Sequence, residues 1–308
     1  METVIRTAAL CKAYHHTLAV DHLEMQVEKG AIYGFIGQNG AGKSTTFKLL
    51  AGLAHPTGGE MELFGLPFGD AAAQRRTGLL VEDAGVYPNL SATDNCTLKA
   101  LALGLTKPET AVSIALHEVG LETMGRKKVK AFSMGQRRRL GLALALLGSP
   151  DLLLLDEPTN GLDPEGIRDI RALLLKLNEE RGVTIVISSH ILGELEKIAT
   201  CYGILRAGKM VEQITAQELK ARCSDYIALQ TPDAKRAAAL LEEKLGLHEY
   251  EVLPQGEIHI TPAAGTRVEV ADINAMLAQN GVAVQSIATH QQELEDYFLQ
   301  RMGEEDHA

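Results

Sequence analysis

Several features that would assign this chain to a membrane or secreted class are missing. No run of about 18 apolar residues occurs. The most hydrophobic stretch, 140–155, is interrupted by Gly141, Gly148, Ser149, Pro150 and Asp151. The first residues, METVIRTAAL, mix charged with apolar side chains and lack the apolar centre of a signal peptide. We therefore expect a chain that neither crosses a membrane by itself nor is secreted.

Cysteine and positive charge are also scarce. The four cysteines, Cys11, Cys96, Cys201 and Cys223, form no CxxC pair and have no histidine at the spacing of a local metal motif. Four reduced thiols, typical of a cytosolic protein, are the expectation. Lys and Arg total 30 against 40 Asp and Glu, a net charge of −10. This excess of negative charge argues against a general nucleic-acid-binding coat.

The first two thirds of the 308-residue chain alternate between strand-like and helix-like patterns. Buried strands are expected at 31–37, 152–155 and 183–188, and helices at 43–53, within 96–125 and at 165–181. Strands that alternate with helices predict an α/β domain with a largely parallel sheet. We place this domain at residues 1–215.

A different pattern follows residue 215. Strands are expected at 226–230, 250–253, 257–260 and 282–287, and helices at 233–245, 268–279 and 291–300. The order βαββαβ with a terminal helix predicts a small ferredoxin-like α+β domain. We place this second domain at residues 216–308.

A glycine-rich loop joins the predicted strand at 31–37 to the helix at 43–53. The segment from Gly37 to Ser44 fits the phosphate-loop pattern G-x-x-x-x-G-K-[ST] without a mismatch. Its glycines let backbone N–H groups converge on phosphates, Lys43 can reach the β- and γ-phosphates, and the Ser44 hydroxyl can ligate Mg²⁺. A plain glycine turn is the competing interpretation, which the flanking strand and helix disfavour. The residues predicted to bind nucleotide phosphates are Gly37, Gln38, Asn39, Gly40, Ala41, Gly42, Lys43, Ser44 and Thr45.

Two acids, Asp156 and Glu157, follow the four leucines of 152–155. Acids at the end of a buried strand need either a cation or contact with solvent. Taken alone, Asp156 and Glu157 could therefore equally be two exposed acids at a strand end. Together with a phosphate loop they predict a P-loop nucleotide hydrolase. Asp156 would anchor Mg²⁺ either directly or through a bound water, and Glu157 would orient or deprotonate the attacking water.

Over residues 3–215 the chain resembles the ATP-binding subunits of ABC transporters. The segment 132–136, FSMGQ, resembles the LSGGQ signature, and 158–164, PTNGLDP, resembles the D-loop. His190 stands at the switch-histidine position, and Tyr14 stands where the family stacks an aromatic ring on adenine. Residues 132–167 look especially like the bacitracin-type and lantibiotic-immunity branch of antimicrobial-peptide exporters.

The resemblance implies a head-to-tail dimer, either a homodimer or a heterodimer. ATP would be bound between one subunit's phosphate loop and the other's signature, with His190 helping to position the water. The further ATP-binding residues implied are Ser133, Gly135, Gln136 and Asp163. The resemblance also implies a separate transmembrane permease, ATP and Mg²⁺ as ligands, no nucleic acid, and a cytoplasmic location on the inner face of the membrane.

The function implied is ATP hydrolysis that drives efflux of an antimicrobial peptide or drug. One alternative is an ABC ATPase that acts on ribosomes or DNA. Such proteins usually carry two cassettes or a long coiled coil, whereas this chain has one cassette, no heptad run and net negative charge. A regulatory nucleotide sensor is a third alternative, and it would fit better if Lys43 or Glu157 were missing.

Two positions depart from the family pattern. Met134 replaces the first signature glycine, which makes that loop less permissive. Glu82 aligns with the glutamine of the Q-loop, where it could ligate Mg²⁺ or serve catalysis, while adding like charge beside Asp156 and Glu157. A misaligned or inert surface acid is the alternative. Substitution in register is favoured because residues 85–95 match the segment after the Q-loop in this branch.

Overall fold

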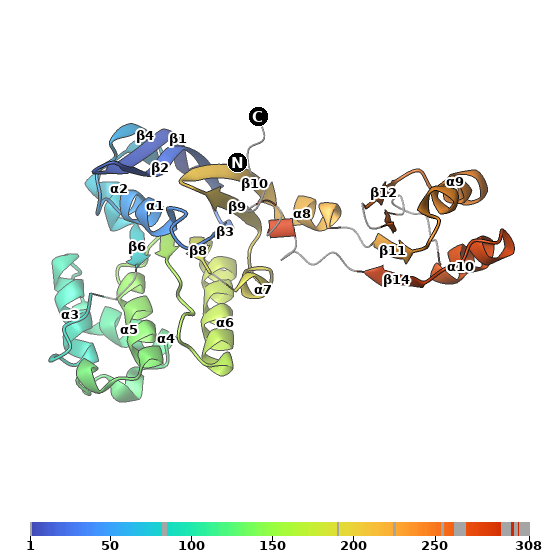
Figure 1. Ribbon diagram of the computed structural model, residues 1–308. Helices are drawn as coiled ribbons and strands as arrows, with labels where there is room; N and C mark the ends of the chain where they lie inside the picture. Colours follow the sequence, from blue (N-terminus) through green and yellow to red (C-terminus); the bar gives the residue numbers. More distant parts are fainter. Residues whose placement is uncertain are drawn as a thin grey trace. The chain divides into compact units, whose positions relative to one another are not determined.

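The computed structural model describes residues 2–81, 85–189, 191–223, 226–253, 256–261, 269–290, 297–298 and 301. The chain divides into two compact units (Figure 1). The first comprises Met1–Ala216 with Gln300–Ala308, and the second comprises Gln217–Leu299. In the part of the chain that is described, no helix is both long enough and apolar enough to cross a membrane.

A six-stranded sheet forms the centre of the first unit. Its order is β10-β9-β3-β8-β7-β6, and all neighbours are parallel except β10, which is antiparallel to β9. The strands are β3 (Ile32–Gly37), β6 (Thr77–Leu80), β7 (Leu152–Leu155), β8 (Thr184–Ser188), β9 (Cys201–Arg206) and β10 (Lys209–Thr215). Strands β7 and β8 are buried along their whole length, which explains their continuous apolar runs. The predicted parallel α/β sheet is confirmed.

A second, antiparallel sheet has the order β2-β1-β4-β5. Its strands are β1 (Thr3–Tyr14), β2 (Thr17–Glu28), β4 (Gly58–Leu63) and β5 (Leu66–Pro67). Along the end of β2, Leu23, Met25 and Val27 are buried while the residues between them are exposed, so one face of the sheet meets the core. Helix α1 (Lys43–Leu50) adds Phe47 and Leu49 to that core, which ties the phosphate-loop helix to this sheet.

The described part of the first unit also contains helices. They are α2 (Ala71–Arg75), α3 (Ala92–Ala102), α4 (Pro108–Glu118), η1 (Glu122–Met124), η2 (Val129–Ala131), α5 (Met134–Leu146), α6 (Pro164–Arg181) and α7 (Leu192–Leu195). Helices α3, α4 and α5 contact one another and form a helical subdomain, drawn in green tones in Figure 1. Helix α5 also packs against β6, which connects the subdomain to the parallel sheet.

The second unit contains a four-stranded antiparallel sheet of order β12-β13-β11-β14. Its elements are α8 (Ala216–Arg222), β11 (Tyr226–Gln230), α9 (Ala234–Leu245), β12 (Tyr250–Val252), β13 (Glu257–Ile260), α10 (Val270–Gln279) and β14 (Ser286–His290). Two split β-α-β units interlock in this order, which is the ferredoxin-like arrangement. Of the predicted last helix, 291–300, the structure describes only Tyr297 and Phe298, which are helical and buried.

The last strand of this sheet lies later in the chain than predicted. The apolar residues from Val282 onward suggested a strand at 282–287, whereas β14 begins at Ser286. Gly281 takes a left-handed conformation with a φ of 73°. The Val282 N–H donates to the Leu277 carbonyl at 3.0 Å, so Val282 is the buried residue of a helix-ending motif.

Candidate active site

The glycine loop connects the end of β3 to the start of α1. Gly42 caps the helix with a φ of 104°, and a Cβ there would lie 2.4 Å from the Ala19 carbonyl oxygen. A Cβ on Gly37 would lie 2.5 Å from the carbonyl oxygen of Leu205. Neighbouring backbone therefore requires glycine at both positions, and the positive φ requires it at Gly42 as well. The result is a helix N-terminus that directs its N–H groups at the loop, the arrangement that binds anions.

Lys43, the first residue of α1, is 8% exposed. Its Nζ donates to the carbonyl oxygens of Gly37 at 2.5 Å and Gln38 at 3.1 Å. Burial lowers the pKa of the Lys43 ammonium below its usual value, and the nearby charges of Glu157 and Asp156 oppose that shift. The lysine and both acids thus share one electrostatic environment.

The two acids are held by a serine that the sequence analysis did not select. Asp156 follows β7 and is 4% exposed. The hydroxyl of Ser188, the last residue of β8, donates to Asp156 Oδ1 at 2.6 Å. The oxygen of this hydroxyl also accepts the backbone N–H of Glu157 at 2.9 Å. Ser188 is fully buried, so this single hydroxyl orients both acidic residues.

The sheet order explains why these groups meet. Strand β8 lies between β3 and β7, and all three are parallel, so their carboxyl ends lie at one edge. Ligand sites of open α/β sheets form at that edge. Glu157 has a φ of 51°, an uncommon conformation for a residue other than glycine and one often found at functional sites. The sequence held one signal for Ser188: a serine ends the predicted buried strand 183–188.

The signature and D-loop residues make helix caps. Ser133 caps α5: its hydroxyl accepts the Gln136 N–H at 3.2 Å, and Gln136 Oε1 accepts the Ser133 N–H at 3.1 Å. Asp163 caps α6 by accepting the Gly166 N–H at 3.1 Å. Such caps favour these residue types whether or not ATP binds. Their predicted role in ATP binding stays a prediction.

The signature segment lies beside the D-loop of the same chain. The side chain of Met134 covers Gly161, where an added Cβ would meet the sulfur at 2.1 Å. At Gly135 an added Cβ would lie 3.0 Å from Leu162 Cδ2. The Met134 side chain, which replaces the first glycine of the signature, therefore packs against the loop that follows Asp156 and Glu157.

The remaining predicted residues occupy less enclosed positions or were not placed. Tyr14 ends β1 with 44% exposure, and the Lys12 ammonium lies 4.9 Å from its ring centroid. Gln38, Asn39 and Gly40 are exposed, Ser44 and Thr45 are half-buried, and Ala41 is buried. Glu82 and His190 lie outside the described residues. The structure thus brings together Gly37, Lys43, Asp156 and Glu157, while the roles of all the predicted site residues stay predictions.

Comparison with known proteins gives consistent matches. A family model described as ABC transporter matches residues 20–160. The chain is 42% identical over 305 residues to the bacitracin transport ATP-binding protein BcrA of Bacillus licheniformis, covering 98% of each. It is 40% identical over 208 residues to the lantibiotic transport ATP-binding protein SrtF of Streptococcus pyogenes, covering 68% of this chain and 89% of that protein. One solved structure with the same fold is a dimeric ATP-binding cassette in a post-hydrolysis state, bound to ADP and Pi. It superposes with a TM-score of 0.65 at 24% identity, and the match covers 69% of this chain and 98% of the cassette. This similarity supports the fold.

Proposed function

The chain belongs to the ABC transporter family as an ATP-binding subunit, and we propose that it hydrolyses ATP to drive efflux of an antimicrobial peptide or drug through a separate permease. The observation that carries this proposal is the shared edge of β3, β8 and β7. It brings a glycine phosphate loop, a buried lysine and two oriented acids into one electrostatic environment.

Residues 37–45 would bind the phosphates of ATP, with Lys43 neutralising their charge. Oxygen ligands from a hydroxyl and a carboxylate are those that Mg²⁺ prefers, and Ser44 and Asp156 supply them. When bound, Mg²⁺ would withdraw charge from the phosphate oxygens. Glu82 is proposed as a further ligand or as part of the catalytic set.

Glu157 is proposed as the general base that takes a proton from the attacking water. Its backbone N–H is held by the Ser188 hydroxyl at the carboxyl end of β8. His190 is proposed to help position the same water. Tyr14 is proposed to stack on adenine, because its ring ends β1 and is exposed.

A second ATP-binding subunit would complete the site. In this proposal Ser133, Gly135, Gln136 and Asp163 of that subunit close over the γ-phosphate, so ATP joins the two subunits and hydrolysis releases them. The fold is shared with a cassette that was solved as a dimer bound to ADP and Pi. We place the assembly at the inner face of the membrane, against the permease.

The test uses the full chain and Glu157→Gln, which keeps the shape of the side chain and removes the base. We expect the variant to retain ATP, to hydrolyse it about 10²- to 10⁴-fold more slowly, and to accumulate as a dimer on a sizing column. Unchanged hydrolysis would remove Glu157 from the role of base. Lys43→Ala, as a companion variant, should lose tight ATP binding.

Fractionation tests the transport part of the proposal separately. The chain should co-purify with a hydrophobic membrane protein, and cells that produce the parent should resist peptide antibiotics better than cells that produce Glu157→Gln. Sedimentation with ribosomes, together with unchanged susceptibility, would overturn export while leaving the ATPase assignment intact.

A further inference from the structure

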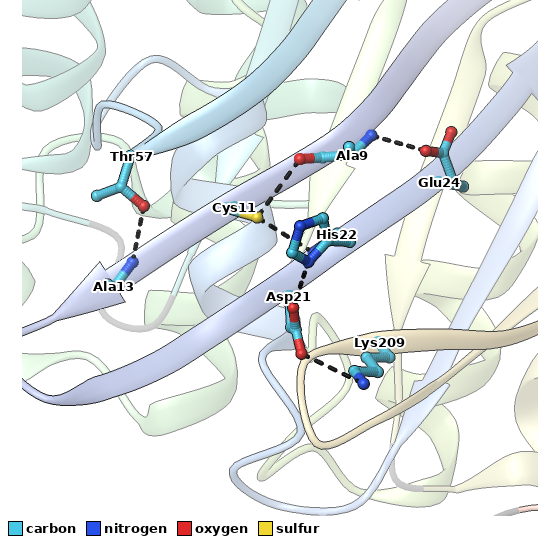
Figure 2. Close-up of polar contacts among 8 residues, drawn as sticks. All are labelled: Ala9, Cys11, Ala13, Asp21, His22, Glu24, Thr57 and Lys209. Atoms are coloured by element: carbon cyan, nitrogen blue, oxygen red, sulfur yellow. Dashed lines mark hydrogen bonds and ion pairs between the residues drawn. The ribbon is translucent and has the colours of Figure 1, made fainter.

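Three side chains of different chemistry lie together on the β1–β2 strand pair (Figure 2). Cys11, Asp21 and His22 each offer one ligand atom, and these atoms lie within 4.8 Å of one another. Where the structure describes the chain, this is the one such group of three or more cysteine, histidine or acidic residues. No histidine stands at local metal-motif spacing from a cysteine in the sequence, but in space the Cys11 sulfur and the His22 ring come close together.

A β-bulge brings the three side chains together. Leu10 pairs with Leu23 and Lys12 with Val20, so Cys11 alone stands opposite both Asp21 and His22. Consecutive side chains of a regular strand point to opposite faces, and an extra residue in one strand removes that alternation. His22 takes a left-handed conformation with a φ of 48°. Its backbone N–H donates to the Cys11 sulfur at 3.3 Å, which holds the bulge against the thiol.

Further contacts orient the ligand atoms. The Asp21 N–H donates to the Gly208 carbonyl at 2.9 Å, and Asp21 Oδ1 lies 2.6 Å from His22 Nδ1. Lys209 approaches Asp21 Oδ2 at 3.4 Å. With side-chain exposures of 20% for Asp21 and 72% for His22, an ion can enter from solvent.

The chemistry of the set selects the ion. Thiolate, imidazole and carboxylate are the three ligand types of zinc, and three protein ligands with an open fourth position are a common arrangement. Mg²⁺ and Ca²⁺ prefer oxygen ligands alone, so sulfur disfavours them. We propose that Cys11, Asp21 and His22 bind a divalent ion of the zinc class at a site chemically distinct from the oxygen ligands proposed for Mg²⁺. The ion displaces the Lys209 ammonium from Asp21, because both compete for one carboxylate.

Cobalt is the probe, because a thiolate bound to Co²⁺ gives a charge-transfer absorption band in the near ultraviolet. The full-length, chelator-treated chain is titrated with Co²⁺ in excess Mg²⁺, and Zn²⁺ is then added as a competitor. We expect one equivalent of Co²⁺ with the thiolate band, and its displacement by Zn²⁺. Absence of the band, or displacement of Co²⁺ by Mg²⁺, would overturn the proposal.

Matched variants assign the site. Cys11→Ser should abolish the thiolate band, and His22→Asn, which tolerates the left-handed backbone, should weaken Co²⁺ binding at least about tenfold. The controls Cys223→Ser and His16→Ala should bind like the parent. A band that survives in Cys11→Ser, or that is lost in Cys223→Ser, refutes the assignment.

One further variant acts in the opposite direction. Lys209→Ala removes the competing ammonium and should tighten Co²⁺ binding, a gain that a misfolded protein could not produce. Equal or weaker binding by a folded Lys209→Ala would show that Asp21 does not ligate the ion.

Discussion

Replacing Ser188 with alanine tests whether one hydroxyl holds both acids of the active site. The variant removes the donor to Asp156 Oδ1 and the acceptor of the Glu157 N–H together. It leaves a space of one oxygen atom at a fully buried position and adds no bulk. Any large effect therefore reports the lost hydrogen bonds and not a steric change.

The structure sets the size of the effect. A hydrogen bond to a charged group contributes about 1.5–3 kcal/mol, and a neutral one about 1 kcal/mol. Loss of both should lower the stability of the first unit by about 3 kcal/mol. For a unit of this size, each kcal/mol shifts the melting temperature by about 2–4 °C, so we expect a decrease of about 6–12 °C.

Catalysis should respond as well, because Glu157 loses the bond that helps to hold its left-handed backbone. Relaxation of that residue should lower kcat for ATP hydrolysis by about ten- to a hundredfold, with a smaller change in KM, since Lys43 and the phosphate loop are untouched. Ser188 acts through Glu157 and is therefore a positioning residue.

The assay is differential scanning calorimetry of the full chain, read on the transition of the first unit, with steady-state ATPase measurements. Ser189→Ala is the matched control: Ser189 is also buried, and its hydroxyl accepts the Ile191 N–H at 3.0 Å and donates to the Ile191 carbonyl at 3.4 Å. Both partners are neutral and the second contact is long, so we expect a loss of about 1 kcal/mol and melting about 2–4 °C below the parent. A Ser188→Ala protein that melts and hydrolyses like the Ser189→Ala control would refute the reasoning.

Single residues give three further predictions. Burial lowers the pKa of Lys43 below 10.5, so the folded protein holds that proton less readily than the unfolded chain. The free energy of unfolding of the parent, relative to that of Lys43→Met, should therefore rise as the pH increases toward 10.5. Urea unfolding at a series of alkaline pH values measures it. A difference in unfolding free energy that stays flat or falls would contradict the prediction. The Thr159 hydroxyl is buried without a partner among the described residues, so Thr159→Val should melt at or above the temperature of the parent. The control Thr7→Val breaks the 2.7 Å bond to the Leu23 carbonyl and should lower the stability by about 1 kcal/mol. If Glu82 serves the metal or the water, Glu82→Gln should change the ATPase rate or its Mg²⁺ dependence in the isolated chain. If it serves coupling, only stimulation by the permease should change. Parental behaviour of both Glu82→Gln and Glu82→Ala in both assays would identify a surface acid.

Much of the fold could be predicted because its signals are local. The strands β7 and β8 are buried on both faces, so they appear in the sequence as unbroken apolar runs. The phosphate loop could be predicted because its glycines, lysine and serine lie within one short segment that is flanked by a strand and a helix. The strand at 282–287 was misplaced because the buried Val282 serves a helix end, and burial alone does not distinguish that from a strand.

Other features depend on contacts between distant parts of the chain. Ser188 and Asp156 are 32 residues apart and meet only because β8 inserts between β3 and β7. Cys11 meets His22 only because the register of β1 and β2 shifts at the bulge. The spacing of these residues along the chain reveals neither the strand order nor the register.

The sequence by itself determined which chemistry two segments carry: the phosphate loop and the acids after β7. Spacing suffices there, because such a loop is built from residues within a few positions of one another. The tertiary structure alone decided which segments are neighbours, and so added Ser188 to the active site and joined Cys11 to Asp21 and His22. That choice depends on the packing of the whole chain, because strand order and register are settled by which apolar faces are buried together.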